Sequence, residues 1–560
     1  MAPYPKNKSG TTAKGGGKPV ANNDPYQQML IVNPSKGLNN LISNNLIDDL
    51  ESPDLMNIQY VEAGAPGKAD GFTLAQTTAS LPRGLGYFND APNSAKYLLT
   101  VDGTKLMNVL GNSYISGATF SPTGTIFMTE VDGSMAIWDG VNGGAQLASG
   151  GTLTRPGTMP AASFSIYWQS LHCAAGVYQQ GQESRLYITG AQQFTATTAT
   201  ISPFQFTNAS VNLNTTAQVP GATVFNGSGA QFIDVNPGDS DKITGLDVFQ
   251  NNLIIFKERS IWQLTFTNGE PDLEMITQAY GCVSFKSLVR VDNDVFFLTR
   301  NGVYVLGYEP NYFAVIRTNE LSARIHPIIS AINPTNFQLA TAMFHQYVYY
   351  LGIPSGSNTN NLTLTYDRRY QAWSQLNHIQ AESFCVYDDI NNVEYMYFTS
   401  STTNQIFQIT PNVYSANGAA IDSYWYSKSY DLGNFNLYKR WVDCAIFFRQ
   451  LTGTVTVTFY SDNGVTAETF SLGTGTGTIG IGSDLIGAFF IGGDITTTDS
   501  DVSGSDENTP YRFSIGQKSR TMQVSVSNAN INENFVVLGL AFRYRPYSSF
   551  AWQSAYKVYN

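Results

Sequence analysis

Charged residues are scarce in this sequence. Only 13% of its 560 residues are Asp, Glu, Lys or Arg, against roughly 25% in a typical soluble protein. Aromatic residues are plentiful, with 33 Phe and 32 Tyr. Because the cores of protein interfaces lose charge and gain aromatic residues, this balance predicts a subunit of an assembly. The alternative is a monomeric all-β protein whose surface is rich in Ser, Thr and Asn.

Several other features are missing. The net charge of −11 provides no basic surface for gripping a nucleic acid backbone. No apolar run reaches the roughly 18 residues of a membrane span, and the lysine-containing N-terminus has no apolar segment typical of a signal peptide. The cysteines are scattered and match no metal-binding spacing, so we expect buried, reduced thiols at Cys173, Cys282, Cys385 and Cys444.

Motifs for catalysis or metal binding are also weak. The chain has no glycine-rich phosphate loop and no serine nucleophile elbow. DVNPGDSD, with Asp234, Asn236, Asp239 and Asp241, lacks the glycine and terminal glutamate of a calcium loop, so we predict an Asx-type turn. A solvated loop explains the acidic cluster at 499–507, and four histidines lack ligand spacing: His172, His326, His345 and His378. The sequence therefore predicts no catalytic residue, cofactor or metal.

What the sequence does contain is a repeated pattern of short strands. Residues 245–266 read GLDVFQNNLIIFKERSIWQLTF, three strand-length runs separated by polar turns. Similar hairpins occur at 95–110, 124–140, 171–190, 287–308, 340–375 and 383–408. Their spacing of roughly 40 to 50 residues is typical of propeller blades. The pattern predicts an all-β fold with a β-propeller of six or seven blades, and the wide third gap indicates an insertion or a missed blade.

The chain divides into four predicted parts. Residues 1–27 form a flexible basic tail, with docking on an acidic neighbour or nucleic acid as the alternative to simple solvation. Residues 28–84 form a lead-in with one short helix or turn, and residues 85–424 form the propeller with an insertion at about 186–235. Cleanly alternating strands predict a β-sandwich-like platform domain at 425–560, with a long loop at 471–508.

The order of several motifs resembles a known family. The lead-in LIDDLESPDLMNIQYVE is followed by GLGYFND, YLLTVDGTKLMNV, GDSDKITGLDVFQNNLIIFKERSIWQLTF and finally LGLAFRYRP. This layout, over roughly residues 30 to 545, is similar to the tail nozzle family of short-tailed bacteriophages, also called tail tubular protein B or phage stabilisation protein. Its most specific part is ITGLDVFQNNLIIFKERSIWQL. The uncharged stretch at 186–233 and the loop at 471–508 depart from the family.

The resemblance implies a virion tail protein made in the host cytoplasm. It implies a homohexameric ring at the distal end of the tail tube, with propellers around a channel that retains and then conducts double-stranded DNA. The implied partners are a tail adaptor protein and tail fibres or spikes, and no catalytic residue is implied. The competing hypothesis is a receptor- or glycan-binding propeller, including a glycoside hydrolase, in which Tyr370 and Trp373 could stack on sugars.

Two further expectations can be checked against a structure. Trp262 and Phe256 should be buried in one blade, with Lys257–Arg259 at an exposed turn, so that Trp262→Ala costs about 3–5 kcal/mol. The uncharged stretch at about 186–233 and the loop at 471–508 should be contact elements, because insertions into regular modules often carry function. The first contains Phe194, Phe204, Phe206 and Phe225, and the second contains Phe489 and Phe490 beside an acidic tip.

Overall fold

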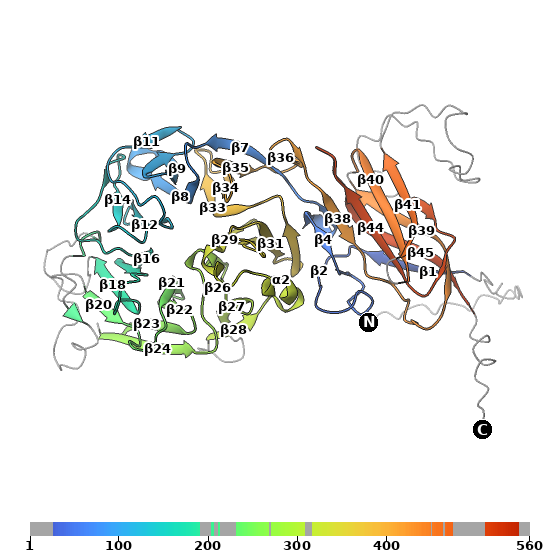
Figure 1. Ribbon diagram of the computed structural model, residues 1–560, viewed down its shortest axis with the longest axis horizontal. Coiled ribbons are helices and arrows are strands. Elements are labelled where there is room, and N and C mark those ends of the chain that lie inside the picture. The colour runs from blue at the N-terminus through green and yellow to red at the C-terminus, as the bar shows by residue number, and fades with distance from the viewer. Residues whose placement is uncertain are drawn as a thin grey trace, which may run out of the picture.

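The protein is built almost entirely from strands. The structure, a computed structural model, describes residues 26–190, 203–206, 211–212, 231–267, 270–308, 316–449, 451–462, 465–473 and 510–547. Figure 1 shows a ring of small sheets beside a β-sandwich, with the N-terminal strands between them. The predicted all-β propeller fold is confirmed.

Seven small, mostly antiparallel sheets form the propeller, and the first strand of each as ordered below is the innermost. The first strands contact one another from β8 through β12 and β16 to β21, and from β25 through β29 and β33 back to β8. In chain order the sheets are β8 (Pro82–Asp90), β9 (Ala95–Asp102), β10 (Lys105–Asn108) and β11 (Ser113–Ile115); β12 (Phe127–Val131), β13 (Ser134–Trp138), β14 (Ala145–Leu147) and β15 (Leu153–Thr154); β16 (Phe164–Trp168), β17 (Leu171–Ala175), β18 (Arg185–Gly190), β20 (Gln231–Asp234) and β19 (Val211–Asn212); β21 (Ile243–Phe249), β22 (Asn252–Lys257), β23 (Ile261–Thr267) and β24 (Glu270–Thr277); β25 (Val289–Val291), β26 (Asp294–Leu298), β27 (Val303–Tyr308) and β28 (Ile316–Glu320); β29 (Thr341–His345), β30 (Val348–Ile353), β31 (Leu362–Asp367) and β32 (Ala372–Leu376); and β33 (Ala381–Asp388), β34 (Glu394–Ser400) and β35 (Gln405–Ile409).

A strand from the N-terminal side completes the seventh sheet. β7 (Phe72–Thr77) pairs antiparallel with β35, and the short strands β36 (Ser415–Ala416) and β37 (Ala419–Ala420) extend the same sheet. Gly71 allows this arrangement, because a Cβ there would lie 2.0 Å from the Ser415 carbonyl oxygen. The ring is therefore closed by hydrogen bonds between residues more than 300 positions apart.

The stretch between Arg185 and Asp234 belongs in part to the third sheet. β18 and β20 are its third and fourth strands, so the insertion lies between them. Phe204 and Phe206 are 3% and 4% exposed and pack with Trp138 and His172. The expectation that these two rings are contact elements is wrong, since they fill this chain's own core. Phe194, Phe225 and the loop around Phe489 and Phe490 lie outside the described residues.

The fourth sheet corrects a second expectation. Phe256 on β22 is fully buried, as predicted, but Trp262 on β23 is only half-buried. Lys257 is not at an exposed turn: it is 0% exposed, because its Nζ donates to the Val235 carbonyl and to the Asp239 carboxylate. Arg259 alone of the three turn residues is exposed. The four cysteines are buried free thiols, as predicted.

Two sheets form the sandwich, and both include N-terminal strands. One contains β39 (Lys439–Arg449), β42 (Tyr511–Ser514), β43 (Lys518–Ser519), β45 (Val536–Pro546), β1 (Gln27–Val32), β5 (Ile58–Tyr60) and β6 (Pro66–Lys68). The other contains β4 (Leu55–Met56), β38 (Ser423–Tyr426), β44 (Met522–Asn528), β40 (Thr454–Ser461) and β41 (Val465–Gly473). The lead-in is thus an integral part of the sandwich.

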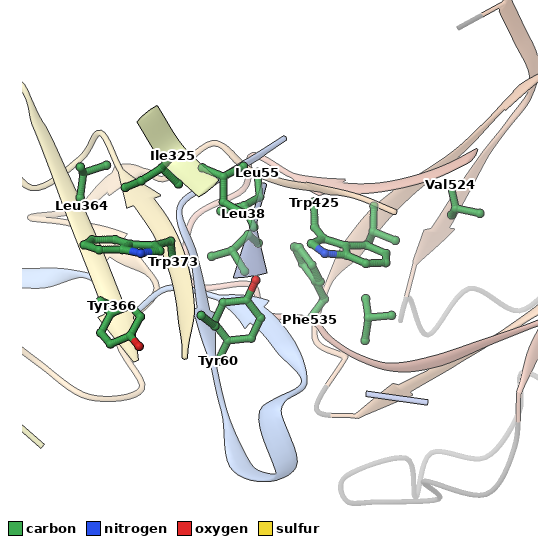
Figure 2. Packing of buried hydrophobic residues seen from close by; sticks show 14 of the residues in the cluster. Leu38, Leu55, Tyr60, Ile325, Leu364, Tyr366, Trp373, Trp425, Val524 and Phe535 are labelled. Carbon is green, nitrogen blue, oxygen red and sulfur yellow. The ribbon is translucent and has the colours of Figure 1, made fainter. Parts of the chain in front are cut away.

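One hydrophobic core runs from the propeller into the sandwich. Figure 2 shows Leu38, Leu55 and Tyr60 of the lead-in between Trp373 of β32 and Trp425 of β38. Both tryptophans are at most 2% exposed. β2 (Gly37–Leu38), which pairs in parallel with β3 (Glu51–Ser52), packs on β32. Because each tryptophan side chain buries a large apolar area, this core holds the propeller and the sandwich together as one body.

Helices are few and short. They are η1 (Glu62–Gly64), η2 (Ala91–Asn93), η3 (Phe285–Ser287), η4 (Ala323–Ile325), α2 (His326–Ser330) and η5 (Phe337–Leu339). Of the two alternatives for the lead-in, residues 43–50 form turns rather than a helix. Among the described residues, none of the helices has the length and apolar character needed for a membrane crossing.

Candidate functional site

The link between the fourth and fifth sheets contacts the inner strands of several other sheets. η3 places Phe285 against rings from two other sheets, with centroid distances of 5.5 Å to Phe127 on β12 and 5.1 Å to Phe164 on β16. The first contact is edge-on, with the ring planes at 90°, a favourable geometry for aromatic pairs. Side chains from three directions therefore meet on the propeller axis.

An ion pair lies beside Phe285. Lys286, which follows Phe285, donates from Nζ to the Glu382 carboxylate at the start of β33. Their side chains are 7% and 21% exposed. Glu382 Oε2 also accepts the Gly84 backbone N–H of β8 at 2.9 Å. Through Phe285 and Lys286 the link contacts the second, third and seventh sheets at once. It therefore stabilises the arrangement of these sheets around the centre of the propeller.

A buried polar cluster joins the lead-in, the propeller and the sandwich. Asn57, which is 1% exposed and has a φ of 55°, lies between β4 and β5. Its Nδ2 donates to Asn377 Oδ1 at 2.8 Å and to the Asp422 carbonyl at 2.6 Å. Its Oδ1 accepts the Asn377 N–H at 2.9 Å and lies 2.8 Å from His378 Nδ1. One amide side chain thus bonds to both modules.

Lys68 makes a second polar connection at the junction. It is 1% exposed, and its Nζ donates to Asn528 Oδ1 at 2.7 Å and to the Asn530 carbonyl at 2.8 Å. Burial lowers the pKa of Lys68 to about 8, while Glu533 and Asp422 act in the opposite direction. A buried cation held by neutral acceptors fixes β6 to the loop after β44.

A pocket of about 400 Å³ lies where the sixth sheet meets the lead-in. Asp367 in this pocket accepts from the Arg369 guanidinium at 2.7 Å, and that guanidinium lies over the rings of Tyr347 and Tyr370. Burial raises the pKa of Asp70, which also lines the pocket. The lining combines carboxylates, a guanidinium and aromatic rings: Gln59, Tyr60, Val61, Asp70, Gln346, Tyr347, Val348, Tyr350, Thr365, Asp367, Arg369, Ala372 and Leu376.

The predicted sugar-stacking pair is not a surface platform. Trp373 is 2% exposed, and its Nε1 donates to the Leu321 carbonyl at 3.0 Å inside the shared core. Tyr370 packs beside Gly64 and under Arg369. Trp373 is therefore unavailable for stacking on a sugar, and of the aromatic residues near the pocket it is Tyr347 that is exposed, at 59%.

The carboxylates of DVNPGDSD are held by the protein's own groups. Asp234 pairs with Arg185 at 2.8 Å and Asp239 with Lys257 at 2.7 Å. Asp239 Oδ1 also accepts the Asp241 N–H at 3.0 Å, which forms the predicted Asx-type turn. Burial acts to raise the pKa of Asp239, but the bond from Lys257 keeps it below its usual range. Within the described residues no cluster of His, Cys, Asp and Glu could hold a metal ion.

Each of the four histidines lies beside another group of the protein. His172 is fully buried, and its Nδ1 lies 2.7 Å from the Pro203 carbonyl. Burial lowers the pKa of His172 to about 4. His378 lies in the junction between Asn57 and the Asp70 carbonyl, and burial also lowers its pKa to about 4. His345 lies 3.5 Å from Glu394, and His326 lies 3.3 Å from Ser330.

Sequence reasoning missed the residues that close the axis and join the modules. Phe285 and Lys286 occur in CVSFKS, between two predicted hairpins, where no period marks them. Asn57 occurs in a short lead-in without a strong strand pattern. For the closure of the ring of sheets by β7, the sequence does contain a signal. FTLAQT at 72–77 has a strand-like composition and lies before the first hairpin, as a closing strand would.

Comparison with known proteins adds little. No protein-family model matches the chain, and no curated protein sequence matches it. Among solved structures, the chain is similar to a complex of BBS1N with ARL6DN (10% identity, TM-score 0.35), to the AfRom2 CNH domain (6%, 0.36) and to the computationally designed Ika8 protein (8%, 0.33). Each match covers 61% of this chain and 98%, 99% and 100% of the other chain, respectively. These scores are too low to carry an argument, so the fold assignment depends on the seven sheets.

Proposed function

We propose that the chain is a structural subunit of a bacteriophage tail, the nozzle at the distal end of the tail tube. Six copies form a ring that closes the channel, retains the packaged DNA and conducts it during ejection. A tail adaptor protein and tail fibres or spikes are its partners in the virion. The proposal assigns the chain no catalytic activity and no cofactor.

The observation that carries this proposal is the way the two modules are joined. A continuous core from Trp373 to Trp425 and the polar bonds of Asn57 make propeller and sandwich one building block. Phe285 and Lys286 contact the inner strands of three different sheets, so in this proposal the DNA channel lies between subunits rather than through one propeller.

The charge balance supports the same proposal. A net charge of −11 lets DNA slide past without being held, because like charges repel along the channel. Low overall charge with many aromatic residues suits a chain that buries surface against its neighbours. The channel in this proposal makes no sequence-specific contact with DNA.

Particles assembled with and without the chain test this function. We expect particles that contain it to keep their DNA protected from added nuclease, and particles that lack it to lose that protection. Adding the purified chain to the defective particles should restore it. Full protection in particles without the chain would contradict the proposal.

The pocket of about 400 Å³ favours one alternative, a receptor- or glycan-binding protein, including a glycoside hydrolase. Its carboxylates, Arg369 and Tyr347 are group types that bind sugars through hydrogen bonds and stacking. Measuring oligosaccharide binding by the wild type and by the pocket variant Arg369→Ala separates the two hypotheses. A stable monomer that binds a glycan and loses that binding in Arg369→Ala would replace the nozzle proposal.

A further inference from the structure

One outer face of the sandwich is basic in an otherwise acidic protein. Arg440 on β39 is directly opposite Lys518 on β43 and Arg545 on β45. All three side chains are exposed. Directly opposite residues of antiparallel strands point to the same side of a sheet, with strands 4.7–4.9 Å apart. The three cations therefore form one row, which we call the basic row.

The basic row lacks compensating charge. Within the described part of the chain none of its members forms an ion pair, whereas Arg543 on the next row pairs with Asp443. Like charges directly opposite in a sheet destabilise it. Lys518 also lies over the ring of Tyr547 at 4.4 Å and that of Tyr438 at 5.3 Å. A row of exposed cations, one of them packed on aromatic rings, is arranged to receive an anionic surface.

The propeller of the same chain presents a complementary surface. Residues 72–420 contain 23 acidic and 15 basic residues. β24, the outermost strand of the fourth sheet, exposes Asp272 and Glu274 on one side. Their cross-strand neighbours are the neutral Thr265 and Gln263. We call this pair the acidic edge, and within the described residues it has no cationic partner.

We infer that the basic row binds the acidic edge of a second copy of this chain. The inference rests on the proposed ring and names the contact that builds it. In Figure 1, β24 lies on the side of the propeller remote from β39 and β45, so one subunit can use both surfaces at once. A contact between two different surfaces is head-to-tail, and such contacts close into rings when the rotation permits. Opposite charges bring the subunits together in the correct orientation.

Two charge-reversal variants test this contact in the full-length chain. The row variant, Lys518→Glu/Arg545→Glu, leaves Arg440 between two glutamates, so the monomer gains favourable cross-strand pairs and stays folded. The edge variant is Asp272→Lys/Glu274→Lys. Native mass spectrometry should show a ring for the wild type. Each variant alone should need at least a tenfold higher concentration to assemble.

An equimolar mixture of the row variant and the edge variant tests most directly whether the two surfaces bind each other. In an alternating ring the reversed row of one variant meets the reversed edge of the other, and the unchanged surfaces also match. We therefore expect the mixture to recover the ring, and raising the salt concentration to weaken it, because exposed charges are screened. Lys105→Glu/Arg155→Glu, which changes the net charge by the same amount at two propeller positions that form no ion pair within the described residues, should assemble like the wild type.

The other outcomes overturn the inference in distinguishable ways. Unchanged rings in both variants would show that neither surface is a contact, and loss in the row variant alone would exclude β24 as the acceptor. If the row variant kept its ring but lost binding to a 30-base-pair DNA duplex, the basic row would be a nucleic acid surface instead. A monomeric wild type would refute the ring itself, and with it the proposed function.

Discussion

The propeller and the sandwich are assembled from the chain in different ways. In the first six sheets of the propeller, apart from the inserted part of the third, each antiparallel hairpin joins strands that are neighbours in sequence, with turns such as Asp132–Gly133 and Gln250–Asn251 at positive φ. In the sandwich, β1 pairs with β45, where Gln27 is opposite Tyr544. The propeller is a series of local units, whereas the sandwich requires both ends of the chain.

This difference shows which contacts stabilise the folded chain as a whole. Local hairpins form with little loss of loop entropy, but they leave faces that must be covered by their neighbours. Three long-range elements supply that cover: β7 closes the ring of sheets, η3 contacts inner strands of several sheets, and the lead-in joins the propeller to the sandwich. We therefore expect substitutions at these long-range contacts to cost more than substitutions within a single hairpin.

The largest effect should come from Trp373→Ala. Trp373 is 2% exposed in the core shared by the two modules, so its loss should lower the free energy of unfolding by about 3–5 kcal/mol. Trp262 is half-buried within one hairpin unit, and Trp262→Ala should cost only about 2 kcal/mol, less than the sequence suggests. Urea unfolding measures both, and equal losses would contradict the comparison.

Gly37→Ala should break the contact between the lead-in and the propeller. Gly37 has a φ of +81°, and a Cβ there would lie 2.5 Å from the Trp373 backbone nitrogen. Strain and overlap together should cost about 3 kcal/mol. Gly433→Ala is the matched control, since Gly433 has a φ of +74° with no atom within 4 Å. It should cost about 1 kcal/mol, and similar losses in both variants would show that the junction contact contributes nothing.

Lys286→Met should weaken the closure of the axis. The substitution leaves Glu382, whose side chain is 21% exposed, with the Gly84 N–H but without its cation. We expect a loss of about 2–3 kcal/mol in thermal or urea unfolding. Adding Glu382→Gln should recover part of it, because the unpaired charge is removed. A double variant as unstable as the sum of the two single variants would argue against a coupled pair.

The pH dependence should be smaller and located in the third sheet. Burial lowers the pKa of His172 from 6.5 to about 4. Between these values the unfolded chain binds a proton that the folded chain does not, so stability falls as the pH falls. Between pH 7 and pH 5 this histidine should cost about 2 kcal/mol. His172→Gln should reduce the acid sensitivity by that amount, with the rest coming from groups such as His378. An unchanged pH profile would contradict this role.

The same contrast explains how far the sequence alone could lead. Runs such as LIIF and VFFLT with polar turns predicted the hairpins, because strand and turn preferences are local. The positions of Phe285 and Asn57 depend on chain segments brought together only by the closed ring, so no local pattern marked them. Lys257 was misplaced for a similar reason: its carboxylate partner, Asp239, lies on the link between the third and fourth sheets.

The surface charge was only partly predictable. The shortage of charge and the net value of −11 were evident from composition. The basic row was not, because Arg440, Lys518 and Arg545 are far apart in sequence and become neighbours only when β43, β39 and β45 pair. Long-range strand pairing thus creates both the stabilising contacts and the proposed docking surface.

The mass of the purified full-length chain under native conditions tests the central claim most directly. At micromolar concentration and moderate salt, we predict a species with the mass of six chains. Its population should fall as the salt concentration rises, because charge complementarity contributes to the contact. A chain that stays monomeric under these conditions, with its propeller and sandwich folded, would contradict the assignment as a ring-forming tail subunit.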